Sequence, residues 1–200
     1  SVLDADGALL TLQFIPRPEV VERMKAQGKL GKLNLPGFHL GDGWFTVPAQ
    51  TPGDTPIYVC EGIGAAWSCW KATGAMAVAT CGSGRVRKVA TQLRQQYAHT
   101  ELVLVADVGK EQACDAIARA VRARVVCMPE GWSNNSDVND YALREGHDAL
   151  AELLESVRDP APAQSADDGV VLTRASGIKP EPIAWLWPGW LAQGKVQLLA

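Results

Sequence analysis

Two carboxylates stand at the ends of two short apolar segments. Glu61 follows residues 57–60, and Asp107 follows residues 102–106. Each segment contains β-branched residues, is too short for a helix, and precedes a glycine and a helix-like sequence. Both segments therefore predict strands that carry an acid at the carboxyl end, where ligands bind in an open α/β sheet. Two acids brought there by neighbouring strands could share one divalent cation.

Two further acids, Asp137 and Asp140, come soon after a later predicted strand. Mg²⁺ prefers one or two carboxylates, completed by waters and substrate phosphates, so these acids indicate a phosphoryl-transfer site. The alternative is that such acids cap the helices that follow them. Asp107 could accept from the amides of the next loop, and Asp137 could be an N-cap. Glutamate is a poor N-cap, which favours the metal hypothesis for the pair of Glu61 and Asp107.

A glycine-rich loop, Cys-Gly-Ser-Gly at residues 81–84, precedes a basic helix. Glycines let backbone amides approach a phosphate, and a helix N-terminus favours an anion. The alternative is a tight turn followed by a solvated basic face. A lysine close to Asp107 could also reach a substrate phosphate, although a surface lysine would look the same. The residues predicted to contact a nucleotide or DNA are Gly82, Gly84, Arg85, Lys88 and Lys110.

The composition limits the class of protein. A chain of 200 residues can form one full domain, and a net charge of −3 excludes a globally basic nucleic-acid binder while leaving room for a local basic face. The five cysteines show neither a C-x-x-C pair nor zinc-ligand spacing, which predicts free thiols. The absence of a signal peptide and of a membrane-length apolar run predicts a soluble, cytoplasmic protein with no membrane partner.

From residue 57 onward, predicted strands and helices alternate. Four strands separated by helices imply βαβ crossovers and a mainly parallel sheet, and therefore an α/β fold. Strands are expected at residues 57–60, 75–79, 101–106 and 124–128, and helices at residues 62–73, 85–97, 111–122, 138–144 and 148–158.

The segments on either side of this alternating region have a different composition and pattern. Strand candidates at residues 8–15 and 44–47, with a weak helical period between them, predict a small β-rich subdomain. A stretch rich in Pro, Ala, Asp and Ser predicts a linker, and an aromatic segment and a buried-strand candidate at residues 194–200 follow it. The predicted division is a β-rich subdomain at 1–54, an α/β domain at 55–158, a linker at 159–182 and the start of a further domain at 183–200.

The motifs themselves resemble a known family. The run of Glu61-Gly62, Ala65-Ala66, Ser68 and Ala72-Thr73-Gly74 is followed by Asp107 and by Ser136-Asp-Val-Asn-Asp140. This pattern resembles the Toprim domain shared by topoisomerases and primases, with a spacing similar to that of plasmid- and phage-type DNA primases. The resemblance covers about residues 55 to 158, and residues 3–47 resemble the small β-rich subdomain that precedes Toprim in those primases.

The resemblance implies nucleotidyl transfer with Mg²⁺ or Mn²⁺, ribonucleoside triphosphates and a single-stranded DNA template. Glu61 would lie near the metal and the attacking hydroxyl, Asp107 would be a metal ligand, Asp137 a further one and Asp140 a weaker candidate. The family usually has D-x-D after this strand, whereas this chain reads Asp-Val-Gly at 107–109, so the second aspartate is missing. A nearby glutamate, Glu111, could substitute. A catalytically degenerate Toprim module and a Toprim nuclease stay open as alternatives.

The last segment has a resemblance of its own. Residues 182–200 are similar to the entry into a RecA-like hexameric helicase domain, so the chain is expected to be a piece of a longer primase-helicase, with the helicase domain in cis. The phosphate-binding loop of such domains does not occur in these residues, and ATPase activity is not assigned to them. The alternative is an ordinary C-terminal strand of the same domain.

Overall fold

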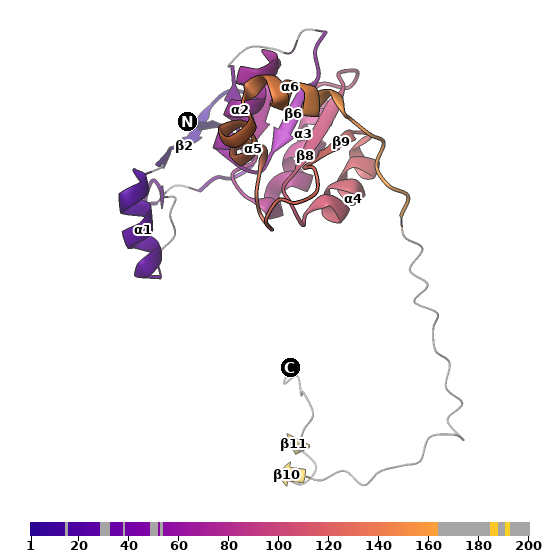
Figure 1. The fold of residues 1–200 in the computed structure, drawn as a ribbon. Coiled ribbons are helices and arrows are strands. Elements are labelled where there is room, and N and C mark those ends of the chain that lie inside the picture. The colour runs from indigo at the N-terminus through magenta and orange to yellow at the C-terminus, as the bar shows by residue number, and fades with distance from the viewer. Residues whose placement is uncertain are drawn as a thin grey trace, which may run out of the picture. The chain divides into compact units, whose positions relative to one another are not determined.

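The computed structural model describes residues 1–14, 16–28, 33–37, 39–48, 52, 54–163, 185–187 and 191–192. The chain forms two compact units, Ser1–Ala163 and Gln164–Ala200. Figure 1 shows that the first unit is built around one twisted sheet with helices packed against it. The second unit is described only at two short antiparallel strands, β10 (Trp185–Trp187) and β11 (Leu191–Ala192). The strand expected at 194–200 and residues 164–182 of the expected linker lie outside the described residues.

The central sheet has five strands, and four of them are the predicted parallel ones. Neighbouring parallel strands pair as β7 with β6, β6 with β8, and β8 with β9. The fifth strand, β5, is antiparallel to β7, with Thr46 opposite Val78. In order across the sheet the strands are β5 (Phe45–Val47), β7 (Ala77–Ala79), β6 (Ile57–Cys60), β8 (Leu102–Ala106) and β9 (Arg124–Cys127).

The fold class is therefore the predicted one, with one difference in strand number. The segment at residues 44–47 was expected to remain with the N-terminal subdomain, but β5 joins the central sheet. The physical reason is that β7 would otherwise present an unpaired row of N–H and C=O groups, which its antiparallel neighbour satisfies.

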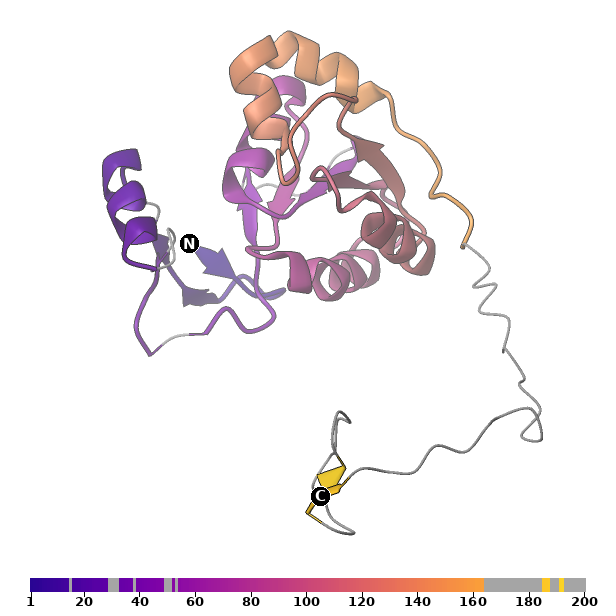
Figure 2. The same cartoon turned by 60° about the horizontal axis from the view of Figure 1, so that its bottom comes forward.

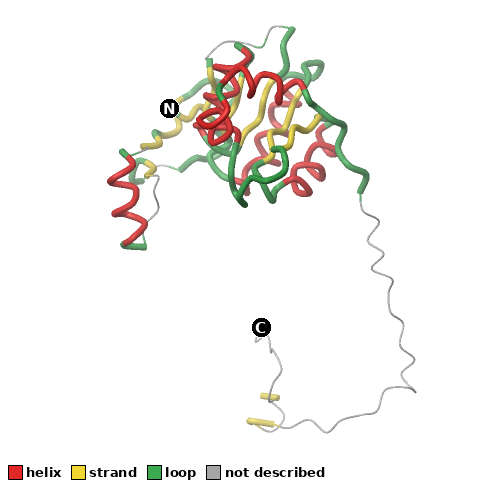
Figure 3. The backbone as a smooth tube through the Cα atoms, in the orientation of Figure 1, coloured by secondary structure: helices red, strands yellow, loops and turns green. Residues whose placement is uncertain are grey.

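Helices cover both faces of the sheet, as Figures 2 and 3 show. All five residues of β8 are buried, because alternate side chains pack against helices on opposite sides. Leu102 and Leu104 contribute to the core on one face, and Val103 and Val105 to the core on the other. The first face carries α3 (Val86–Gln96), preceded by the short helix η1 (Ser83–Arg85), and α4 (Glu111–Val121); the second carries α2 (Ile63–Thr73), α5 (Val138–Glu145) and α6 (His147–Glu155).

The N-terminal part is β-rich, as predicted, but the strand expected at 8–15 is divided. The chain changes partner at Leu12, whose carbonyl accepts a hydrogen bond from the Leu35 N–H. One half pairs with the N-terminal strand and the other with a strand beyond helix α1 (Pro18–Ala26). The strands are β1 (Val2–Leu3), β2 (Leu9–Thr11), β3 (Gln13–Phe14) and β4 (Leu33–Asn34).

The end of the first unit returns to the sheet. Arg158 and Val125 exchange two backbone hydrogen bonds of 2.9 Å at the outer edge of β9. The Arg158 guanidinium also donates two hydrogen bonds to the buried carboxylate of Asp115 on α4, and the Ala161 N–H donates to the same carboxylate. The first residues of the expected linker are therefore held against the domain.

All five cysteines are free thiols, as predicted. None of the helices in the described part of the chain combines the length and the apolarity needed to cross a membrane.

Candidate metal and phosphate site

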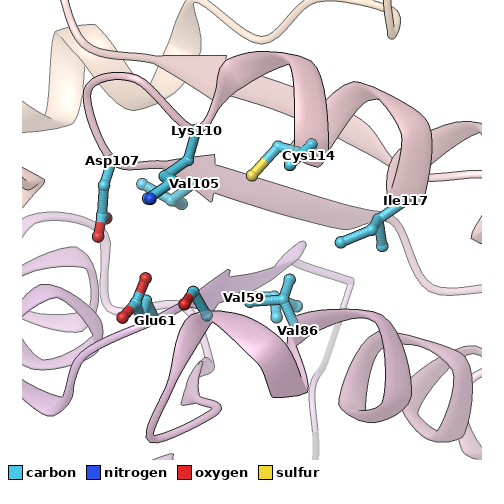
Figure 4. A pocket seen from close by; sticks show the side chains of 10 residues that line it. Val59, Glu61, Val86, Val105, Asp107, Lys110, Cys114 and Ile117 are labelled. Carbon is cyan, nitrogen blue, oxygen red and sulfur yellow. The ribbon is translucent and has the colours of Figure 1, made fainter. Parts of the chain in front are cut away.

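The two strand-end acids meet at the carboxyl edge of the sheet. Parallel pairing of β6 with β8 places Glu61 and Asp107 side by side, because each is the first residue after its strand. Figure 4 shows the two carboxyl groups facing one another, with Lys110 beside them. Both acids line two adjacent hollows. One is a small cavity of about 50 Å³ with an apolar floor, and the other is an open hollow of about 400 Å³.

The environment of Asp107 favours its protonated form. Burial raises the pKa of Asp107 to about 7, helped by the negative charges of Glu61 and Asp137 and by a hydrogen bond to Glu61, while the positive charge of Lys110 opposes the shift. Asp107 therefore keeps its proton in a large fraction of the molecules near neutral pH. A divalent cation that replaced this proton would relieve the same repulsion, so the donor set fits a hard cation.

Asp137 lines the open hollow, but it also caps a helix. Its Oδ1 accepts hydrogen bonds from the N–H groups of Asn139 at 2.9 Å and Asp140 at 3.0 Å. The Asp140 carboxylate accepts in return from the Asp137 N–H at 3.2 Å, which completes a capping box at the start of α5. The capping alternative is thus confirmed for Asp137. Asp140 is not among the residues that line either hollow, and metal binding by these two acids stays a prediction.

The loop after Asp107 is fastened to the loop that leads to Asp137. The Val108 N–H donates to the Ser136 carbonyl at 3.0 Å, and the Asn135 N–H donates to the Val108 carbonyl at 2.9 Å. These main-chain bonds hold the loop after Asp107 against the loop before Asp137, and so fix Asp107 and Asp137 relative to one another. Asn135 also lines the open hollow.

Gly109 occupies the position of the expected second aspartate. Its φ of +86° is a conformation that favours glycine, and a Cβ at this position would meet the Oδ1 at the exposed end of the Asn134 side chain. A side chain two residues after Asp107 would therefore adopt a strained backbone conformation and displace the end of the Asn134 side chain. The hypothesis that Glu111 substitutes gains no support, because its Oε1 accepts from the Gly109 N–H at 2.9 Å and the side chain turns back onto the loop.

Asp107 does not cap the helix that follows it. The Lys110 N–H donates to the main-chain carbonyl of Asp107, and α4 begins after Lys110 without a capping hydrogen bond from a side chain. The capping alternative is therefore wrong for Asp107, and its carboxyl group remains directed at Glu61.

The predicted phosphate-binding arginine and lysine of α3 contact the N-terminal part of the chain. Arg85 Nη2 donates to the Gly41 carbonyl at 3.1 Å and to the Gly43 carbonyl, and Lys88 forms an ion pair with Asp42. The structure does not direct these cations at the acid pair, and their contact with a nucleotide or DNA stays a prediction.

The glycine-rich loop does approach the acids through a residue that the sequence argument missed. Ser83, between Gly82 and Gly84, lines both hollows, and neither glycine would meet a neighbour within 4 Å if it carried a Cβ. The signal for Ser83 was its position inside the glycine-rich loop. Contact between these glycines and a phosphate stays a prediction.

A partly buried contact joins the two motifs of the sequence. The Ser68 hydroxyl on α2 donates to the Asn139 Oδ1 on α5 at 3.1 Å, and a Cβ at Gly64 would lie 3.3 Å from the Asn139 side chain. The helix that follows Glu61 is thereby held against the helix that Asp137 caps. This contact joins residues 71 positions apart, so the sequence pattern could only show that both motifs were present.

The acids do not form a closed metal cage. Across the described ranges of the chain, no group of three or more His, Cys, Asp or Glu side chains lies close enough to hold a metal ion. Two adjacent carboxylates, with Asp137 further along the same hollow, leave coordination positions for waters and substrate phosphates, as Mg²⁺ sites in phosphoryl-transfer enzymes do.

A mainly parallel α/β sheet brings these two acids together at its carboxyl edge, which is where ligands bind in open α/β folds. Residues 56–148 match the family model described as the Toprim domain, and we assign this segment as a Toprim domain. Toprim domains generally bind Mg²⁺ and are usually found in enzymes that act on nucleic acids. Neither the curated proteins nor the solved structures contain a significant match to the chain.

Proposed function

We propose that this chain is the nucleotidyl-transferring core of a DNA primase that joins ribonucleotides on a single-stranded DNA template. The observation that carries the proposal is the contact between Glu61 and Asp107 at the ends of neighbouring parallel strands of a Toprim domain. The dense motif that begins at Glu61, with the spacing of plasmid- and phage-type primases, favours a primase over other Toprim enzymes.

In this proposal Glu61 and Asp107 hold Mg²⁺ or Mn²⁺, with Asp137 as a further ligand and Asp140 as a weaker candidate. The bound metal supplies stabilisation of the charge that develops on the transferred phosphoryl group. In the same proposal, Glu61 lies near the attacking hydroxyl and accepts its proton. Ser83 and Lys110 line the hollow where the triphosphate of a ribonucleotide would lie, and the amides of Gly82 and Gly84, on either side of Ser83, are proposed to contact it.

The wider setting of the proposal rests on sequence. The similarity of residues 182–200 to the entry of a RecA-like helicase domain supports a primase-helicase in which the helicase acts in cis. Single-stranded DNA and ribonucleoside triphosphates are the proposed partners. Five free thiols fit a reducing compartment, and we place the protein in the cytoplasm as part of the proposal.

The metal site is tested by calorimetric titration of Mn²⁺ and of Mg²⁺ into the wild type and into two variants, Glu61→Gln and Asp107→Asn. Each variant removes one charged oxygen ligand from the pair, so metal affinity is expected to fall by at least about tenfold. Asp148→Asn, which removes an exposed acid at the start of α6, is the matched control. Unchanged metal binding in both site variants shows that the assignment is wrong.

The reaction is tested with the full-length protein, ribonucleotides and single-stranded DNA. Primer synthesis that is lost in Glu61→Gln supports the primase, whereas cleavage of DNA without synthesis indicates a Toprim nuclease. Binding of DNA without either reaction indicates a degenerate module, the alternative that the missing second aspartate favours. The helicase-like segment favours the primase over the nuclease.

A further inference from the structure

A lysine shares the hollow with the two acids. Lys110 lines both the small cavity and the open hollow, and Figure 4 shows its amine on the same side of the site as the carboxyl groups. Its charge acts on Asp107, whose pKa it lowers against the effects of burial and of Glu61. Within the described part of the chain, Lys110 forms no ion pair within 4 Å. Its ammonium group is therefore available to an anionic ligand.

Main-chain hydrogen bonds fix the backbone position of Lys110. The Lys110 N–H donates to the Asp107 carbonyl at 2.9 Å, and the Lys110 carbonyl accepts from the Cys114 N–H at 2.9 Å as the first turn of α4 forms. The preceding loop is itself bonded to residues 135 and 136. Lys110 is thus held three residues from the acid, at a helix N-terminus, while its side chain remains exposed.

The other basic residues near this edge have their own partners. Lys88 pairs with Asp42, and Arg85 donates to the carbonyls of Leu40, Gly41 and Gly43. Lys110 is therefore the cation that the described structure leaves facing the acids.

The number of carboxylates limits how many metal ions the site can hold, and therefore how much positive charge these ions supply. Sites with two metal ions need several carboxylates to hold cations about 4 Å apart. In this chain two carboxyl groups are in contact, and the position two residues after Asp107 is a glycine. Glu111 is bonded to the loop, and Asp137, which lines the same hollow, uses its Oδ1 to cap α5. A triphosphate bound here would keep more negative charge than one divalent cation can balance.

We propose that this site binds a single divalent cation and that the Lys110 ammonium takes the place of a second one, by binding a non-bridging phosphate oxygen of the nucleotide. The inference rests on the proposed function, because it assumes a nucleoside triphosphate as the ligand. To that function it adds a residue that contacts the substrate, and it sets the stoichiometry at one metal ion per site. A lysine is suited to this contact because its ammonium is a compact point charge on a flexible stem.

The first test measures ATP binding by the full chain in EDTA at low salt, so that no metal contributes. Lys110→Met is expected to weaken ATP binding on the order of tenfold, and Lys110→Arg to keep most of the affinity because it keeps the charge. Lys71→Met, which removes an exposed lysine in the last turn of α2, is the matched control and should bind ATP as the wild type does. Equal affinity in Lys110→Met and the wild type, or no ATP binding by the wild type, overturns the inference.

The second test is the stoichiometry of Mn²⁺ binding in the presence of ATP. One Mn²⁺ per chain is expected in the wild type, and two per chain overturns the inference. The outcomes also separate this inference from the proposed function. ATP binding that depends on Lys110 without primer synthesis rejects the primase and retains the lysine contact, whereas primer synthesis that Lys110→Met leaves intact rejects the lysine contact and retains the primase.

Discussion

At the scale of residues, the two acids of the site are not equivalent. Both follow a buried strand, but Asp107 experiences burial together with the charges of Glu61 and Asp137, and its pKa rises to about 7. In the unfolded chain the same carboxyl has an ordinary pKa near 4. The folded protein therefore binds a proton that the unfolded chain releases between these two values. Stability from this group is complete below about pH 4 and is lost as the pH rises through about 7.

This difference predicts how stability depends on pH without metal. The free energy of unfolding of the wild type in EDTA should fall between pH 4 and pH 7, and Asp107→Asn should lose this part of the pH dependence because it removes the titrating group. Urea unfolding at pH 5, 6, 7 and 8 measures the effect. Asp148→Asn should keep the wild-type slope. If Asp107→Asn and the wild type gave parallel curves, the raised pKa would be disproved.

At the scale of elements, the loops at the carboxyl edge of the sheet determine which side chains reach the candidate site. The sequence predicted the four parallel strands and the helices between them, because apolar runs and terminal glycines mark their bounds. It could not predict that the Asn134 side chain lies beside Gly109, since the two residues belong to loops 25 positions apart in the chain. It also could not choose between metal binding and capping for Asp137, because both require the same carboxylate at the same place.

The loop contact is tested by comparing Gly109→Ala with Gly131→Ala. Both glycines have a φ near +87°, but a Cβ at Gly131 meets nothing within 4 Å, whereas one at Gly109 meets the Asn134 side chain. Each variant should lose about 1 kcal/mol of stability from backbone strain, and Gly109→Ala about 0.5 kcal/mol more, because the end of the Asn134 side chain must turn aside. Urea unfolding gives both values.

The same pair of variants reports on the site. Mn²⁺ affinity is expected to fall in Gly109→Ala, because its loop carries Asp107, and to stay unchanged in Gly131→Ala. Removing the opposing side chain in the double variant Gly109→Ala, Asn134→Ala should recover the additional loss of stability. Equal losses in the two single variants would show that the contact with Asn134 does not restrain the loop.

At the scale of the whole molecule, the Toprim segment depends on chain that flanks it. The sequence predicted the domain at about 55–158, and the family match covers 56–148. Both ranges leave out β5, which forms one edge of the sheet by pairing with β7. A strand of three residues carries too little pattern for its partner to be predicted from the sequence. Arg158 closes the other side through its bridge to Val125 and its ion pair with Asp115, which is buried.

The role of the returning segment is tested by two truncations. A chain that ends at Ala163 should unfold with the same midpoint as the full chain, because residues 1–163 supply their own core. A chain that ends at Val157 should lose roughly 2 to 4 kcal/mol, because Asp115 stays buried without the partner that neutralises it. The substitution Arg158→Met in the full chain should reproduce most of that loss. A stable chain ending at Val157 would show that the ion pair contributes little.

The position of β5 also bears on how the domain behaves when it is cut out. Both margins of the parallel sheet are covered by residues outside the family match, one by β5 and the other by Arg158. A polypeptide of residues 56–148 alone would present two bare strand edges, β7 and β9, and such edges recruit further chains by adding strand to strand. We expect that polypeptide to grow into large assemblies detectable by light scattering, while residues 1–163 at equal concentration stay as small particles.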